Sequence, residues 1–214
     1  AALMLKGVNP WLCLPIAALA GCIAGALTGF LHVKLHIKDL LAGILTMTAL
    51  YSVNYRIAGA PNQFLMGYPT IFSLPESIPS FVLSYKYIII ILIIAVFMKL
   101  ALDWYLSTKS GFLLRSAGDN PALVVTLAQS PGKIKIIGLA ISNGLVALSG
   151  SIFCQEQRVF EISSGTGAIV IGLASVIIGT SLFKNVSFMK ATTAVLIGSV
   201  IYKACVAAAL KFFE

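Results

Sequence analysis

The chain has 214 residues, of which 59% are hydrophobic and only 10% are charged, and its mean hydropathy is +0.99. Soluble domains carry about 25% charged residues, so this composition excludes a water-soluble globule and indicates a bilayer as the solvent. The formal net charge is +8, but the 15 Lys and Arg residues stand singly between apolar runs. Because they form no basic stripe with interleaved aromatic residues, nucleic acid is excluded as a partner.

Six apolar stretches approach or exceed the length of about 20 residues that a helix needs to cross a bilayer. Lipid leaves no backbone polar group unpaired, so each stretch is predicted to be a helix. The alternating strands of a membrane barrel are absent from the sequence. The chain is therefore predicted to be all-α, a polytopic transmembrane helical bundle. The predicted spans are Pro10–Leu31, Asp39–Gly59, Lys86–Leu106, Ile134–Cys154, Thr166–Phe183 and Ala191–Leu210.

Positive charge alternates between the connections. Residues 60–85 contain no Lys or Arg, and residues 155–165 contain only Arg158, beside two glutamates. Because positive residues are retained on the cytoplasmic side, these two connections are predicted to lie outside and the basic ones inside. The basic connections are residues 32–38, 107–133 and 184–190.

This orientation places residue 1 on the outer side of the membrane. The chain begins with Ala1, and its first nine residues have neither the basic start nor the cleavage site of a signal peptide. We therefore expect further spans upstream and interpret residues 1–214 as a single transmembrane domain of a longer membrane protein.

Small residues mark the expected helix contacts. Gly21, Gly25 and Gly29 recur at every fourth position, a pattern that lets two helix backbones approach closely. Weak inverted similarity links "LAGCIAGALTGF" with "LAISNGLVALSGSIF", and inverted repeats are common in transporters. The four cysteines have no CxxC spacing and are interpreted as small buried hydrophobic residues.

The connection at residues 107–133 contains a predicted short helix. Asn120 is a good N-cap and Pro121 suits the first helical position, while Asp119 favours the helix dipole. An apolar face follows, and Pro131-Gly132 is expected to end the helix after about two and a half turns, too short to persist alone. The face is formed by Leu123, Val124, Leu127 and Ala128. It can pack on the protein itself or the lipid interface, or it can bind a cytoplasmic partner.

Three blocks of sequence carry a resemblance to a known family. They are "RSAGDNP" at residues 115–121, "GLAISNGLVALSGSIF" and "GTGAIVIGLASVIIG", and "LLAGILTMTALYSVNYRI" near residue 40 fits the same pattern. Nearly the whole chain resembles the permease subunits of bacterial ABC importers, in the branch grouped with branched-chain amino acid and ribose permeases. Its tryptophan/tyrosine-type members are the most similar.

The resemblance implies that residues 107–133 carry a coupling helix that docks on a separate ATPase subunit. The residues it implicates are Arg115, Gly118, Asp119, Asn120, Pro121, Leu123, Val124 and Leu127. It also implies a second permease copy, an extracytoplasmic solute-binding protein and a multi-pass location in the bacterial plasma membrane. Five positions depart from the family pattern: Ser130-Pro131 replaces a Gly-hydrophobic pair, Arg158 replaces an expected Gly, Glu161 a usual Asp, and Thr180 a frequent acid.

The residues themselves provide no energy source within the chain. No GxxxxGK[ST] loop occurs, so ATP is expected to be bound by the partner subunit, and no cofactor is expected here. Ion coupling would need acids or histidines deep in the helices, whereas the acid well inside a span, Asp103, lies one turn from Lys99 and is predicted to pair with it. No clustering typical of an enzyme or a metal site is evident.

A few polar residues inside the spans are candidates for a solute pathway. Each also has a structural interpretation, because Arg56 can extend to the interface and hydroxyl or amide groups often join helices. An unpaired cation such as Lys203 costs about 3 kcal/mol in a span, so it is expected to face a cavity, a partner or another subunit. The candidates are Asn54, Arg56, Ser142, Asn143 and Lys203.

The sequence thus predicts a permease subunit that is not itself an enzyme and that carries an amino acid or a similar small metabolite. The alternatives are an ATP-independent secondary transporter or channel, and a membrane-embedded enzyme.

Overall fold

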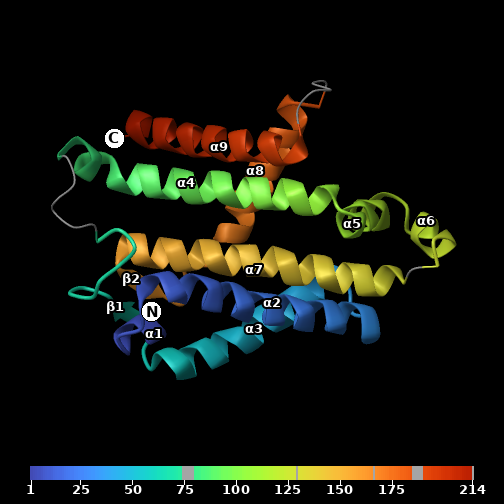
Figure 1. Cartoon of the computed structure of the whole chain (residues 1–214), viewed down its shortest axis with the longest axis horizontal. Coiled ribbons are helices and arrows are strands. Elements are labelled where there is room, and N and C mark those ends of the chain that lie inside the picture. The colour runs from blue at the N-terminus through green and yellow to red at the C-terminus, as the bar shows by residue number, and fades with distance from the viewer. Residues whose placement is uncertain (74–79, 129, 166, 185–189, 214) are drawn as a thin grey trace. The chain divides into compact units, whose positions relative to one another are not determined.

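The computed structural model describes residues 1–73, 80–128, 130–165, 167–184 and 190–213. The chain divides into two compact units, Ala1–Ile162 and Ser163–Glu214. Helices make up most of both units (Figure 1), which confirms the predicted all-α class. The first unit contains α1 (Ala2–Leu5), α2 (Pro10–Lys34), α3 (Asp39–Ala58), β1 (Asn62–Phe64), α4 (Ser80–Ser107), α5 (Lys109–Asp119), α6 (Pro121–Thr126), α7 (Pro131–Gln157) and β2 (Val159–Glu161). The second contains α8 (Ala168–Leu182) and α9 (Ala191–Phe213).

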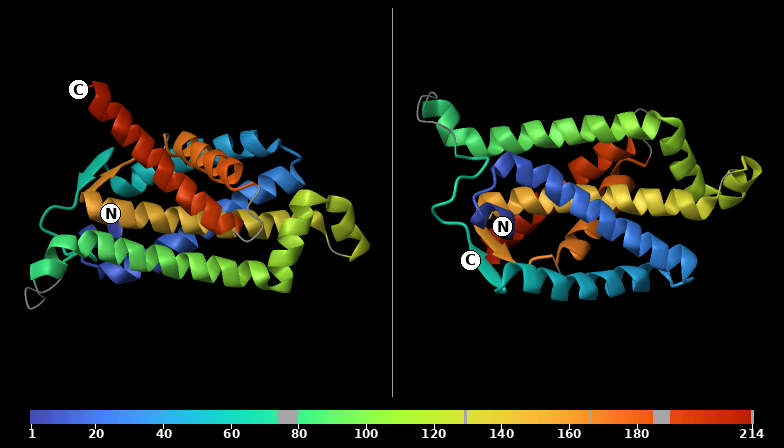
Figure 2. Two further views of the ribbon diagram at one scale, coloured as in Figure 1. Left: turned by 90° about the horizontal axis from the view of Figure 1, so that it is seen from above. Right: turned by 60° about the horizontal axis from the view of Figure 1, so that its bottom comes forward.

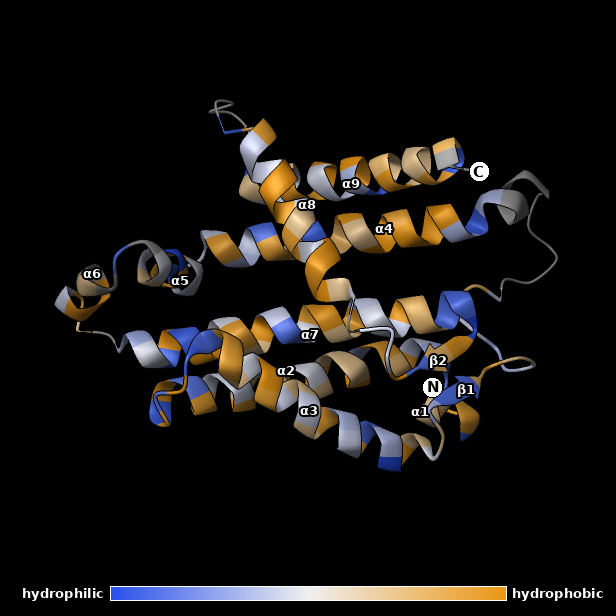
Figure 3. Ribbon diagram, turned by 180° about the vertical axis from the view of Figure 1, so that it is seen from behind, coloured by the Kyte–Doolittle hydropathy of each residue, from blue (hydrophilic) through white to orange (hydrophobic). Residues whose placement is uncertain are grey.

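Within the described residues, four helices are long and apolar enough to cross a membrane. The four are α2, Tyr85–Ser107 of α4, α7 and Ala191–Phe212 of α9. Hydrophobic residues, coloured orange in Figure 3, dominate both α4 and the shorter α8. Two of the six predicted spans, α3 and α8, do not meet this criterion of length and apolar composition. α8 has only 15 residues, fewer than a crossing normally takes, and α3 has 20 residues but interrupts its apolar ones with hydroxyl, amide and charged groups.

The predicted glycine stripe of α2 packs against α7. An added Cβ on Gly21 would lie 2.5 Å from the Cβ of Ala147, and one on Gly29 would lie 2.8 Å from the Cα of Ile136. The contacts run in opposite directions along the two helices, so α2 and α7 are antiparallel neighbours, as Figure 2 shows. The two segments with inverted sequence similarity are thus direct packing partners.

A buried hydroxyl pair joins α2 to α3. The Oγ1 atoms of Thr28 and Thr46 lie 3.0 Å apart, and the two residues are only 8% and 5% exposed. The Thr46 hydroxyl also donates to the carbonyl of Ala42, one turn earlier on its own helix. Threonine can bury its hydroxyl group at a helix contact because a backbone carbonyl of the preceding turn accepts its hydrogen bond.

The two connections predicted to lie outside form a structure that the sequence analysis did not predict. β1 and β2 pair antiparallel, with Gln63 opposite Phe160. Beside this ribbon, Leu65, Ile71 and Phe72 are at most 2% exposed, and Leu65 packs in a cluster with Met4, Cys13 and Cys154. The ribbon and the packed residues close one end of the α2–α7 pair.

Gln155, at the end of α7, holds this closure in place. Its side chain is almost completely buried; Oε1 accepts from the backbone N–H of Ile71 at 3.1 Å, and Nε2 donates to the carbonyl of Pro10 at 3.4 Å. One amide therefore connects α7 to the loop after β1 and to the start of α2.

Gln155→Leu is expected to lower the free energy of unfolding by about 1–3 kcal/mol, because it leaves the buried N–H of Ile71 without an acceptor. Limited proteolysis should then cut within residues 65–73 at lower protease concentration. The matched control is Gln157→Leu, at an exposed position two residues on. Equal protease resistance of the two variants would contradict this role for Gln155.

Arg158 ends α7 in the left-handed conformation, with φ 54°. Its carbonyl accepts from the backbone N–H of Leu65 at 2.8 Å, so the conformation also positions β2 against the loop. The sequence resemblance led us to expect glycine here. The structure supplies the physical reason, because residues with a Cβ are disfavoured at this φ and glycine is not.

At this position, Arg158→Gly is expected to leave the thermal stability unchanged or raised. Arg158→Val should lower the free energy of unfolding by about 1 kcal/mol, since a β-branched side chain tolerates a positive φ poorly. Thermal unfolding of the two variants in the same detergent measures the difference. A valine variant as stable as the glycine variant would show that the backbone does not hold this conformation.

In the second unit, α8 and α9 pack against each other through small residues. A Cβ on Gly179 of α8 would lie 2.8 Å from the carbonyl carbon of Ala194, and one on Gly198 of α9 would lie 2.7 Å from the Cα of Gly179. Ser175 is buried at the same contact and donates its hydroxyl to the carbonyl of Ile171 at 2.7 Å. Glycine again permits the close approach.

Candidate functional site

The connection predicted to bind a partner is more structured than the sequence indicated. It contains α5, an 11-residue helix that the sequence analysis missed. Thr108 caps this helix by accepting from the backbone N–H of Gly111 at 3.3 Å. The Tyr105 and Ser110 hydroxyl groups, 3.0 Å apart, hold the turn between α4 and α5. The Thr-x-x-Gly cap was the signal available in the sequence.

The start of α6 is as predicted, but its end is not. Asn120 caps the helix, since its Oδ1 accepts from the backbone N–H of Ala122 at 3.1 Å. The helix ends at Thr126 after six residues, rather than after two and a half turns, because Ala128 adopts a left-handed conformation with φ 54°. Pro131 does not end α6: it is the first residue of α7, where a proline lacks no helical hydrogen bond.

The apolar residues of α6 point in two directions. Val124 is fully buried in a cluster with Ala117 of α5 and Ile134 of α7. Val125 and Leu127 remain 61% and 49% exposed. The segment therefore packs on its own chain through Val124 and leaves Val125, together with Leu127 just after α6, exposed.

The other residues implicated in coupling lie along the same segment. Arg115 and Gly118 are exposed on α5, and the carbonyl of Ser116 accepts from the N–H of Asn120 at 2.8 Å. The side chains of Asp119, Pro121 and Leu123 lie outside the part of the chain that the structure describes in detail.

The five candidate pathway residues lie on three different helices, α3, α7 and α9. Asn54 and Arg56 are exposed on the last two turns of α3, and Ser142 is exposed on α7. Asn143 is half-buried against α2; its amide donates to the carbonyl of Leu139 at 3.0 Å, and its Cβ would lie 2.8 Å from one on Gly25. Lys203 is exposed on α9, in the second unit.

The ion pair predicted within α4 is present. Lys99 and Asp103 of α4 form an ion pair at 3.0 Å, one helical turn apart. Among the described residues, no group of three His, Cys, Asp or Glu side chains could hold a metal ion.

Residues 1–213 match the protein family described as the branched-chain amino acid transport system / permease component. The chain belongs to this family. The family is one of transport permeases, and the chain is a multi-pass protein of the bacterial inner membrane, consistent with its apolar helices.

Two relatives give the permease further context. It is 41% identical over 198 residues to the tyrosine transport system permease protein of Clostridioides difficile (strain R20291), covering 92% of this chain and 64% of that protein. It is 32% identical over 176 residues to the uncharacterized protein RP368 of Rickettsia prowazekii (strain Madrid E), covering 80% of this chain and 59% of that protein. The permease thus spans less than two thirds of either relative. No solved structure matches it.

Proposed function

We propose that this permease forms the membrane pathway of an ATP-binding-cassette importer and couples to a separate ATPase through residues 107–133. In this proposal ATP binds to the partner, so the permease is no enzyme and carries no cofactor. A second permease copy completes the pathway, and a solute-binding protein delivers solute from the outer side.

The observation that carries this proposal is the presentation of α6. A six-residue helix cannot persist alone in water, yet Asn120 caps it and Val124 anchors it between α5 and α7. The exposed Val125 and Leu127 stand beside this anchor. An anchored helix with exposed apolar side chains has the form of a knob that fits a groove on a partner. We therefore assign docking to Val125 and Leu127, and assign Val124 to anchoring the helix.

For the solute, we propose an aromatic amino acid of the tyrosine type. The relative from C. difficile is described as a tyrosine transport permease and is 41% identical. Few charged residues lie within the predicted spans, which suits a zwitterion better than a strongly anionic solute.

Transport in proteoliposomes tests the proposal. The full-length permease, reconstituted with its ATPase and binding protein, should accumulate labelled tyrosine only when ATP is present. Uptake driven by a sodium or proton gradient without ATP would overturn the proposal in favour of a secondary transporter. ATP-driven uptake of another amino acid would overturn only the choice of solute.

A further inference from the structure

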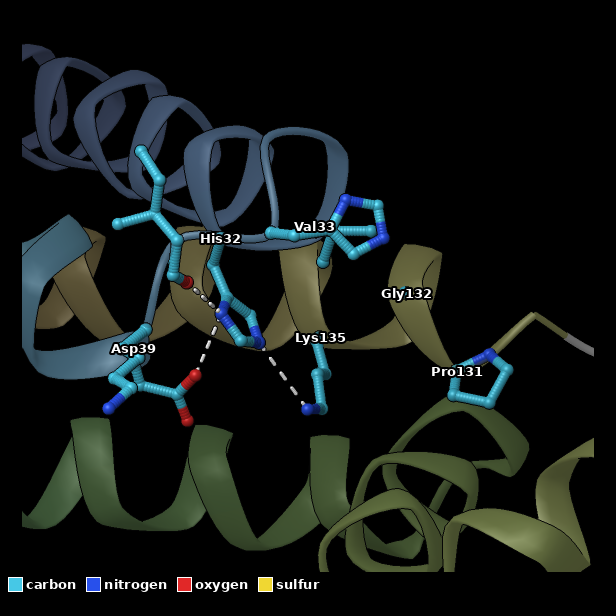
Figure 4. Close-up of a pocket in the computed structure, with 9 residues that line it drawn as sticks. His32, Val33, Asp39, Pro131, Gly132 and Lys135 are labelled. Atoms are coloured by element: carbon cyan, nitrogen blue, oxygen red, sulfur yellow. Dashed lines mark hydrogen bonds and ion pairs between the residues drawn. The ribbon is translucent and has the colours of Figure 1, made fainter.

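A cavity of about 550 Å³ opens at the corner between α2 and α3, beside the first turn of α7 (Figure 4). It lies at the end of these helices opposite the β1–β2 ribbon, which is the end that the charge pattern predicts to be cytoplasmic. Four of the residues that line it carry basic side chains: His32, His36, Lys38 and Lys135.

The corner holds the His32 ring in one orientation. Nδ1 lies 2.8 Å from the carbonyl oxygen of Ile37 and 2.7 Å from Oδ1 of Asp39. Both partners can only accept a hydrogen bond, so Nδ1 carries the hydrogen and is the donor. Nε2 consequently faces Lys135, whose Nζ is 3.4 Å away, as Figure 4 shows. The imidazole and the ammonium group therefore converge on one side of the cavity.

Positive charge predominates at this point. Asp39 is the acid among the lining residues, and it is already occupied by His32. Lys135 is half-buried, whereas Lys133 on the same helix is exposed, and no carboxylate among the described residues forms an ion pair with Lys135. A half-buried ammonium group without a counter-charge favours the binding of an anion.

We propose that this cavity binds the phosphate group of an acidic membrane lipid, held by the ammonium groups of Lys135 and Lys38. Basic pockets between membrane helices on the cytoplasmic side suit such headgroups. The exposed Leu35 and Leu40, at 57% and 78%, flank the same corner and offer apolar surface to acyl chains. These side chains favour a lipid over a free phosphate ion.

The position of the cavity gives the bound lipid a structural effect. Pro131 and Gly132 line the cavity and begin α7, directly after the segment that contains α6. A phosphate bridging Lys38 and Lys135 would join the α2–α3 corner to the base of that segment. This inference depends on the predicted orientation in the membrane and not on coupling to an ATPase.

Thermal unfolding of the purified full-length permease in a neutral detergent tests the site. Phosphatidylglycerol at saturating concentration is expected to raise the melting temperature by about 3 °C or more, and phosphatidylcholine is expected to have little effect. Lys135→Gln should lose most of the phosphatidylglycerol shift. Lys135→Arg should retain it, because arginine keeps the charge.

The matched control is Lys133→Gln, which removes the same charge at an exposed position two residues away. It should keep the full phosphatidylglycerol shift. Equal losses in the 133 and 135 glutamine variants, or an equal response to the two lipids, would overturn the site. If inorganic phosphate alone produced the whole rise in melting temperature, the site would bind free phosphate and the proposal of a lipid headgroup would be wrong.

Discussion

Gly25→Leu is expected to lower the free energy of unfolding of the permease by about 3 kcal/mol or more, the upper range for overpacking a close contact. A Cβ on Gly25 would meet the carbonyl oxygen of Leu139 and lie 2.8 Å from the Cα of Ala140. These are backbone atoms of α7, so the added side chain can be accommodated only if the two helices separate. Unfolding in detergent, followed by helical circular dichroism, measures the loss.

The control for this experiment is the same change in a helix without the contact. Gly43 lies within α3, and nothing lies within 4 Å of an added Cβ there. Gly43→Leu should be neutral or stabilising by up to about 1 kcal/mol, because leucine has the higher helix propensity. If both variants lost the same stability, the α2–α7 contact would not be the cause.

Combining Val125→Asp with Leu127→Asp is expected to release the ATPase and abolish ATP-driven uptake, while the permease stays folded. Both side chains are largely exposed, so the charges cost little in the free protein. In a docked complex each charge would be buried in an apolar groove. A loss of about 2 kcal/mol, typical of a central interface residue, corresponds to about 30-fold weaker binding.

Co-purification of the ATPase with the tagged permease measures this effect. Met66→Asp is the matched control, because Met66 is 76% exposed and lies in the loop after β1, at the opposite end of the α2–α7 pair. It should retain the ATPase. Retention by the double variant as well would place the docking surface elsewhere.

Predictions from the sequence succeeded where a local rule was sufficient. The Gly21–Gly25–Gly29 repeat, the Asn120 cap and the Lys99–Asp103 pair each depend on residues within one or two helical turns, and the structure contains all three. The end of α6 was misplaced because Pro131 can follow one helix or begin another. Spacing alone cannot distinguish these two positions.

The sequence by itself determined the solvent, the helical class and the family, because hydropathy, charge alternation and several ordered motifs extend along the whole chain. Only the tertiary structure decided that Val124 is an anchor while Val125 is exposed, that Gln155 joins α7 to a distant loop, and that Lys135 meets His32. These contacts connect residues separated by as many as 103 positions, as in the pair of His32 and Lys135. Which face of a helix meets which neighbour depends on the packing of the whole bundle, and no local pattern records it.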